Sequence, residues 1–269
     1  PYYVSGEIAN RDSLLVQTPE SLKARFNLDV RPFHEVISIS PADHTVTVRY
    51  DGQEFTESYD KLILSPGAKP FVPTIEGLAE AKNAYTLRNV PDLDEIMAAL
   101  DNHPKEAVVI GAGFIGLEMA ENLAKRGLQV TIIEKAPHVL PPLDNEMAAF
   151  VQAELLANGV RVITSQAATR FEEQGKVIVL ENGQKITSDL TILSVGVEPE
   201  NGLAKAAGIE LGLRGGILVD EHYETSQKDI FAVGDAIVVK QEITGQDALI
   251  SLASPANRQG RQVADVIAG

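Results

Sequence analysis

The chain has 269 residues, of which 44% are hydrophobic, and a formal net charge of −15. This length accommodates one large or two ordinary α/β domains, and the acidic balance argues against nucleic acid or an anionic membrane as a partner. With no cysteine, these residues form no disulfide, thiolate metal site or thiol nucleophile. The five histidines are scattered without ligand spacing, so no metal site is expected, and no apolar run approaches the length that spans a membrane.

The first quarter of the chain is typical of a β-meander. An alternating strand at Thr45–Tyr50 leads through the turn Asp51-Gly52 into a second strand near residues 54–59. A short apolar strand follows at Leu62–Leu64 and stops at Ser65-Pro66-Gly67.

The central stretch, residues 107–134, contains an ordered series of signals. An apolar strand is followed at once by Gly111-x-Gly113-x-x-Gly116, and an amphipathic helix runs from there to a stop at Gly127. A second apolar strand then ends at Glu134, 23 residues after Gly111. This order predicts a dinucleotide-binding unit, in which the terminal acid holds the adenosine ribose hydroxyls.

Each glycine of this motif has a distinct expected task. Gly111 makes the tight turn, Gly113 lets the backbone approach a pyrophosphate, and Gly116 lets helix and strand pack closely. Phe114 and Ile115 lie between Gly113 and Gly116, and we predict that they also bind the cofactor.

The end of the second strand bears on the choice between the two nicotinamide cofactors. Glu134 favours NAD(H), because its charge repels a 2′-phosphate. Lys135 beside it weakens that preference without reversing it.

Two strand ends in the sequence match each other. Asp60-x-x-Ile-Leu-Ser-x-Gly-x-x-Pro recurs at Asp189 with an offset of 129 residues, and each copy follows an (Asp/Asn)-Gly-Gln hairpin turn. The alternative to a repeat is chance similarity of two strand ends. Gly111 lies 78 residues before Asp189, and the corresponding position before Asp60 is about 18 residues upstream of Pro1. We therefore expect an internal piece of a longer protein, from which a first dinucleotide-binding βαβ unit has been removed.

The last quarter of the chain contains a second glycine-acid signal. Gly215-Gly216 turns into a predicted strand at 217–219, and the segment TSQKDIFAVGDA then brings an apolar strand to Gly234-Asp235. A carboxylate in that position can face a ribityl or ribose hydroxyl, with Gly234 permitting close approach. The chain ends in a helix over residues 252–269.

Together these residues resemble the pyridine nucleotide-disulfide oxidoreductases, through the central NAD fingerprint, the SPGA and SVGVEP strand ends and TSQKDIFAVGDA. The opening PYYVSG and the late LASPANRQGR are similar to the branch of coenzyme A-disulfide reductases, NADH oxidases and NADH peroxidases. In that branch a single redox cysteine precedes Pro-Tyr-Tyr in a Cys-x-Leu-Pro pattern. The resemblance thus implies a catalytic cysteine upstream of Pro1 and no catalytic residue within the chain.

The resemblance also implies roles for individual residues. Asp235 would bind the flavin ribityl chain, and Val36 and the turn Ser65, Pro66 and Gly67 would contact FAD. Phe114 would shield the flavin until the nicotinamide arrives, although the family more often has tyrosine there. Glu118 and Gly196 would lie beside the nicotinamide. Arg31 and Asn257 fall where coenzyme A reductases contact substrate, and the alternative for both is an ordinary surface residue.

The expected architecture is α/β, with a Rossmann-like NAD-binding domain inserted into a truncated, discontinuous FAD-binding domain of the same type. The NAD(P)-binding domain is expected at residues 76–213. The partial FAD-binding domain is expected at residues 1–75 and 214–269.

The expected function is that of an FAD-dependent NAD(P)H oxidoreductase reducing a small disulfide or persulfide, such as coenzyme A disulfide, through flavin and a cysteine outside the chain. The piece itself should be inactive and hold FAD weakly. Alternatives are an NADH oxidase or peroxidase acting on O2 or peroxide, a flavin-dependent ferredoxin reductase and, from another class, a stand-alone NAD-binding module. The intact protein is expected in the cytoplasm as a homodimer, formed through a C-terminal domain that is missing here.

Overall fold

The computed structural model describes all residues from 1 to 269, and the chain divides into two compact units. Unit 1 comprises Pro1–Val16 and Pro70–Gly196, and unit 2 comprises Gln17–Lys69 and Val197–Gly269. No helix is both long enough and apolar enough to cross a bilayer.

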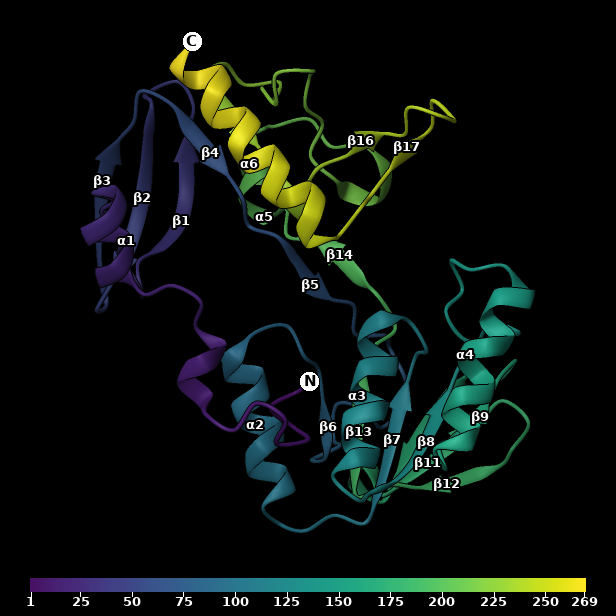
Figure 1. The fold of residues 1–269 in the computed structure, drawn as a ribbon. Coiled ribbons are helices and arrows are strands. Elements are labelled where there is room, and N and C mark those ends of the chain that lie inside the picture. The colour runs from purple at the N-terminus through teal and green to yellow at the C-terminus, as the bar shows by residue number, and fades with distance from the viewer. The chain divides into compact units, whose positions relative to one another are not determined.

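Unit 1 is built on a parallel sheet of five strands in the order β6-β13-β7-β8-β9 (Figure 1). Three helices and a separate three-stranded antiparallel sheet, β10-β11-β12, accompany it. The elements of unit 1 are β6 (Ala84–Tyr85), α2 (Val90–Leu100), β7 (Glu106–Ile110), α3 (Phe114–Lys125), β8 (Gln129–Ile133), α4 (Asn145–Ala157), β9 (Arg161–Ile163), β10 (Ala168–Glu172), β11 (Val177–Leu180), β12 (Lys185–Thr187) and β13 (Leu190–Leu193).

Strand β7 lies at the centre of this unit and is buried on both faces. Val109 belongs to the core formed with α2, α3 and α4, which includes Met119 and Leu123. Val108 belongs to the other core, in which Ile178 of β11 is fully buried. A strand covered on both sides by apolar layers needs apolar residues at every position, which explains the unbroken run of 107–110.

Unit 2 has a related arrangement on a smaller scale. An antiparallel meander, β1-β2-β3, lies beside a two-stranded parallel sheet in which β4 pairs with β15. Ile230 and Ala232 of β15 pack in a core with Ile39 of the meander. Phe231, which lies between them, packs with Val263 of α6. The elements are α1 (Pro19–Phe26), β1 (Glu35–Ser40), β2 (Thr45–Tyr50), β3 (Gln53–Ser58), β4 (Leu62–Leu64), α5 (Gly202–Ala206), β15 (Ile230–Ala232), β16 (Val239–Lys240), β17 (Asp247–Ala248) and α6 (Ala253–Ala268).

The chain passes from one unit to the other at β5 (Ala68–Pro70) and β14 (Val197–Pro199), and these two strands pair. The Phe71 N–H donates to the Gly196 carbonyl (2.9 Å), and the Glu200 N–H donates to the Gly67 carbonyl (3.0 Å). Phe71 and Glu200 are 129 residues apart, and so are Gly67 and Gly196, so the two hydrogen bonds join equivalent positions of the repeat. The sequence repeat thus corresponds to a repeat in backbone geometry.

The boundaries of the units differ from the expected domain boundaries at three segments, residues 1–16, 70–75 and 197–213. Residues 1–16 lie in unit 1, because Val4 is fully buried in its core and accepts a hydrogen bond from Arg126 (2.8 Å). Residues 197–213 lie in unit 2, because Ala204 and Ile209 pack in the core of that unit. Such packing between distant segments is not readable from composition or periodicity.

The predicted strand at 217–219 is wrong. Ile217 forms only isolated bridges, with Leu211 and Ile237. Two 3₁₀ turns, Leu213–Gly215 and Gly234–Ala236, redirect the neighbouring segments before a ladder can extend. By contrast, the hairpin at Asp51-Gly52 is confirmed: it joins β2 to β3, with φ of 49° and 74° as a two-residue turn requires.

The two copies of the repeat differ at one sheet edge. Strand β13 has a neighbour on both sides, whereas β4 pairs with β15 alone. Ile192 of β13 is fully buried, while its counterpart Ile63 is 42% exposed. Strand β4 therefore presents an unpaired edge within unit 2.

The role of Asp189 in holding β7 can be tested by measuring the free energy of unfolding. Its carboxylate accepts the N–H groups of Lys105 (2.8 Å) and Glu106 (3.1 Å) at the start of β7, and these bonds lower the pKa of Asp189 below its ordinary 3.8. Asp189→Asn should lower the free energy of unfolding at pH 7 by about 1 kcal/mol, allowing for solvent screening. Because the folded-state pKa is depressed, this stabilisation is present above pH 3.8 and lost as the pH falls through the folded-state value.

The matched control is Asp60→Asn at the equivalent position of unit 2, where no partner holds the carboxylate. Urea unfolding at several pH values should show a loss for Asp189→Asn only. Equal losses in the two variants would contradict the assigned role of Asp189.

Candidate nucleotide-binding sites

The glycine motif of unit 1 forms a tight turn between β7 and α3. Gly111 has a φ of 101°, and a Cβ atom added there would lie 2.4 Å from the Ser194 carbonyl oxygen. A Cβ on Gly116 would lie 2.0 Å from the Gly111 oxygen, whereas one on Gly113 would meet nothing within 4 Å. Gly111 and Gly116 are thus required by packing, and Gly113 faces open space, as a site for backbone approach to a ligand needs.

The backbone polar groups of Gly111 and Ala112 are all engaged within the protein. The N–H and carbonyl of Gly111 and the N–H and carbonyl of Ala112 each have a partner at 2.6 to 3.0 Å. The Gly111 N–H donates to the Ile133 carbonyl, and the Gly111 carbonyl accepts the Ser194 hydroxyl. The Ala112 N–H donates to the Glu134 carboxylate, and the Ala112 carbonyl accepts the Leu140 N–H.

The donors that remain point to an anion. The N–H groups of Gly113, Phe114, Ile115 and Gly116 have no acceptor in the protein. They lie at the start of a 12-residue helix, whose dipole adds positive potential there. A pyrophosphate is the kind of ligand that fits such a set of donors.

The Glu134 side chain is held in one position. It is 9% exposed, and its two oxygens accept the N–H groups of Ala112 (2.6 Å) and Ala136 (2.7 Å). Lys135 is exposed beside it. The carboxylate retains lone pairs for ribose hydroxyls, and its fixed charge opposes a phosphate on the ribose.

Three of the predicted cofactor-binding residues, Phe114, Ile115 and Glu118, are exposed at the start of α3. Phe114 is 58% and Ile115 41% exposed, and Glu118 follows Phe114 one helical turn later. Burial lowers the pKa of the Pro1 amino group, and the Glu118 carboxylate opposes that shift. Gly196 has a φ of 116° and open space at its Cβ position.

In unit 2, two predicted turns lie at the same edge of the sheet. Strands β4 and β15 are parallel, so their carboxyl ends coincide, and the Val233 N–H donates to the Leu64 carbonyl (3.0 Å). The turn at Ser65 to Gly67 follows the first strand, and the turn at Gly234 follows the second. Ligands of open α/β sheets bind at such edges.

Asp235 is a carboxylate without a partner in the protein. It is half-buried, and burial raises its pKa above the ordinary 3.8. The turn before it is anchored, because the Gly234 N–H donates to the buried Gln259 side chain of α6 (2.7 Å). A half-buried acceptor on a fixed turn suits a ligand with hydroxyl groups.

The remaining predicted residues of unit 2 are less clearly part of a site. Val36 on β1 packs against the core of the unit. The Arg31 guanidinium already binds Asp29 (2.8 Å) and Glu57 (2.7 Å), so a substrate would have to replace these carboxylates. Asn257 is exposed on α6. The substrate roles of Arg31 and Asn257 stay predictions.

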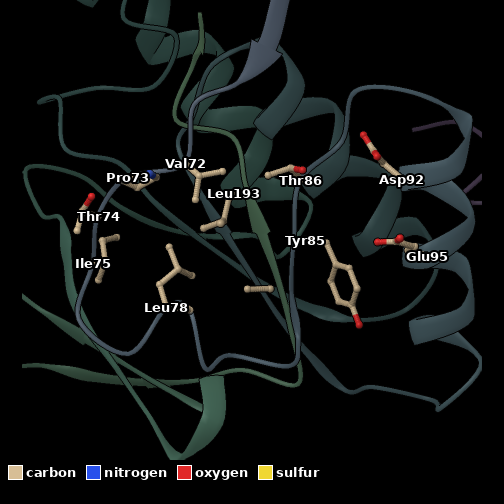
Figure 2. A pocket seen from close by; sticks show the side chains of 12 residues that line it. Val72, Pro73, Thr74, Ile75, Leu78, Tyr85, Thr86, Asp92, Glu95 and Leu193 are labelled. Carbon is tan, nitrogen blue, oxygen red and sulfur yellow. The ribbon is translucent and has the colours of Figure 1, made fainter. Parts of the chain in front are cut away.

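Unit 1 contains a cavity of about 550 Å³ between the 72–79 segment, β6 and α2. Figure 2 shows the side chains that line it. Its lining is mainly apolar, and one of its carboxylates, Asp92, accepts the N–H groups of Arg88 and Asn89 as a helix cap. No predicted cofactor residue lines it. The chemistry of the glycine turn is therefore separate from this cavity.

Two residues that sequence reasoning missed support these turns. Ser194 binds the glycine turn of unit 1, and Gln259 binds the glycine turn of unit 2. The recurrence of serine at positions 65 and 194 was a usable signal for the first. Gln259 has no local signal, because its partner lies 25 residues away.

Comparison with known proteins identifies the family of this chain. Residues 3–260 match the family described as pyridine nucleotide-disulphide oxidoreductase, and the chain belongs to that family. An NADH oxidase of Methanocaldococcus jannaschii is 38% identical and a coenzyme A disulfide reductase of Staphylococcus haemolyticus 32% identical, each over 100% of the chain. The chain spans 60% of the length of each of these curated relatives.

Two solved structures are especially similar. Reduced Bacillus anthracis CoADR-RHD has a TM-score of 0.98 and 49% identity, covering 99% of this chain and 48% of that chain. An NAD-dependent persulfide reductase from A. fulgidus has a TM-score of 0.96 and 35% identity, covering 100% of this chain and 51% of that chain. The α/β architecture with a parallel sheet, predicted from sequence, is confirmed.

The burial of Asp235 leads to a test. Because its folded-state pKa is raised, ionisation of Asp235 costs stability, and that cost appears as the pH rises through the folded-state pKa. Asp235→Asn should therefore raise the melting temperature at pH 7 in ligand-free protein. The gain should vanish below pH 3.8, where the wild-type carboxyl is protonated whether folded or unfolded. Differential scanning calorimetry at several pH values measures it, and a less stable variant at pH 7 would overturn this account.

Proposed function

We propose that unit 1 binds NADH and unit 2 binds FAD, as parts of an FAD-dependent oxidoreductase. The observation that carries this proposal is the pair of glycine turns at the carboxyl ends of parallel strands, one with free N–H donors and one with an unpartnered carboxylate. The bound cofactors supply hydride transfer from nicotinamide to flavin. The residues of the chain bind and orient them.

The residues of unit 1 suit the nicotinamide cofactor. The free N–H groups from Gly113 to Gly116 would hold the pyrophosphate, and Glu134 would accept the ribose hydroxyls. Since the Glu134 carboxylate is fixed by two N–H donors, it cannot easily move aside for a 2′-phosphate. This favours NADH over NADPH.

The residues of unit 2 suit the flavin cofactor. Asp235 would accept the ribityl hydroxyls, with the turn at Gly234 held by Gln259. The turn at 65–67 and Val36 would complete the contacts from β4 and β1. A flavin hydroxyl donating to Asp235 would provide the hydrogen bond that the protein lacks there.

We further propose that a strand from outside these residues completes unit 2. In unit 1, β13 holds β7 by three means: Asp189 binds its first N–H groups, the strand edge pairs with it, and Ser194 binds the glycine turn. Unit 2 has the same three features in Asp60, the unpaired edge of β4 and Ser65, with nothing bound to them. A strand followed by a glycine turn is the segment that fits this edge.

The reaction that we propose is the reduction of a small disulfide or persulfide, coenzyme A disulfide being the first candidate. The relatives that carry these names support this substrate class. The chain contains no cysteine, so the thiolate that attacks the sulfur bond must come from outside these residues.

A second candidate is the reduction of O2 by an NADH oxidase, favoured by the relative of that name at 38% identity. We also propose that the whole protein is a homodimer and is located in the cytoplasm.

The substrate assignment is tested on the whole protein. NADH oxidation should be followed with coenzyme A disulfide, a persulfide, peroxide or O2 as the only acceptor. Turnover with the disulfide or persulfide well above that with O2 is expected. Turnover with O2 alone would favour the oxidase, and NADH binding without turnover on any acceptor would leave only a binding module.

The glycine turn allows a test of cofactor binding that is independent of turnover. Gly113→Ala should leave the melting temperature unchanged, because its Cβ meets no atom within 4 Å, yet weaken NADH binding about tenfold or more by blocking backbone approach. Gly202→Ala, another glycine with room for a Cβ, is the control and should bind NADH normally. Unchanged NADH affinity in Gly113→Ala, measured by fluorescence titration, would contradict the proposed site.

A further inference from the structure

The peptide group between Gly111 and Ala112 is held at both of its polar ends. Its carbonyl oxygen accepts the Ser194 hydroxyl (3.0 Å), and its N–H donates to the Glu134 carboxylate (2.6 Å). Ser194 directly follows β13 and Glu134 directly follows β8, the two strands that flank β7. One peptide plane is thus fixed from both neighbouring strands.

The Ser194 hydroxyl lies within hydrogen-bond distance of two carbonyl oxygens and is nearer to that of Gly111. It also lies 3.1 Å from the Ile110 carbonyl, but that oxygen already accepts the Ser194 backbone N–H (2.8 Å). The Gly111 oxygen has only the hydroxyl. A Cβ on Gly116 would lie 2.6 Å from Ser194 Oγ and 2.0 Å from the Gly111 oxygen, so Gly116 packs tightly against this hydrogen bond.

The orientation of this peptide affects the donors that follow it. Gly111 has a φ of 101° and, lacking a side chain, can rotate at low cost. If its peptide turned over, the Ala112 N–H would leave Glu134, and the free Gly113 N–H would be displaced with the rest of the turn. Holding the Gly111 carbonyl therefore holds the anion-binding donors.

We propose that Ser194 is a positioning residue for the pyrophosphate of NADH, which acts by fixing the Gly111–Ala112 peptide against Glu134. This rests on the proposed binding of NADH by unit 1. Ser194 touches the turn and not the ligand, so its effect should be larger on phosphate-bearing ligands than on adenosine, which meets only Glu134 through its ribose.

The variant that tests this proposal is Ser194→Ala. NADH and ADP-ribose should bind about five- to tenfold more weakly, the loss expected for one part-buried hydrogen bond, while adenosine should be weakened less. Amide hydrogen exchange at Ala112 should become faster in the variant. Ser194→Thr, which keeps a hydroxyl, should restore much of the NADH affinity.

The matched control is Ser188→Ala, at the opposite end of β13. Ser188 is 2% exposed, precedes the other end of β13 and donates to the Leu190 carbonyl (2.9 Å). This variant should lose thermal stability without losing NADH affinity. Equal weakening of NADH, ADP-ribose and adenosine by Ser194→Ala would mark a merely structural role and overturn the proposal.

Two outcomes separate this proposal from the function on which it rests. If wild-type protein fails to bind NADH, the proposed function fails. If wild type binds NADH and Ser194→Ala binds it equally well, only the positioning role fails. Should Ser194→Ala not fold, exchange in the wild type decides: a fast-exchanging Ala112 amide in ligand-free protein would show that the peptide is not held.

Discussion

The close approach of the end of β13 to Gly111 is the constraint on which unit 1 depends. The Ser194 carbonyl occupies the space that a side chain at 111 would need, and the Gly111 carbonyl occupies the space that a side chain at 116 would need. These contacts bring three backbone segments together at the carboxyl end of the central strand. The free N–H groups at the start of α3 converge at that point, as the first N–H groups of a helix do, while the polar groups of Gly111 and Ala112 already have partners inside the protein.

The two units show how one set of strand ends behaves in two environments. Asp189, β13 and Ser194 each hold part of β7, whereas Asp60, β4 and Ser65 carry the same chemical groups without a strand to hold. The difference appears directly in burial, since Ile192 is enclosed and Ile63 is exposed. An apolar residue on an open strand edge is a liability for association, which supports a covering strand in the whole protein.

The carboxylates of the two units illustrate opposite relations between function and stability. Glu134 is buried and its charge is met by two N–H donors, so it adds order to the ligand-free turn. Asp235 is half-buried without a partner, so its charge is unfavourable until a ligand donates to it. Binding at Asp235 would then relieve a cost, whereas binding at Glu134 would use an acceptor that is already in place.

The sequence by itself determined the local elements and the class of the sites. The glycine spacing, the apolar strands and the hairpin at Asp51-Gly52 depend on backbone conformations that single residues impose, and those signals act over a few positions. The strand predicted at 217–219 failed because 3₁₀ turns in its neighbours limited the pairing.

Only the tertiary structure decided which distant groups meet. The placement of residues 1–16 in unit 1, the clamp of Ser194 and Glu134 on one peptide, and the anchoring of Gly234 by Gln259 all join residues far apart in the chain. Such contacts are set by how strands are ordered in a sheet and how helices cover it. No periodicity within one segment specifies the partner that packing brings to it.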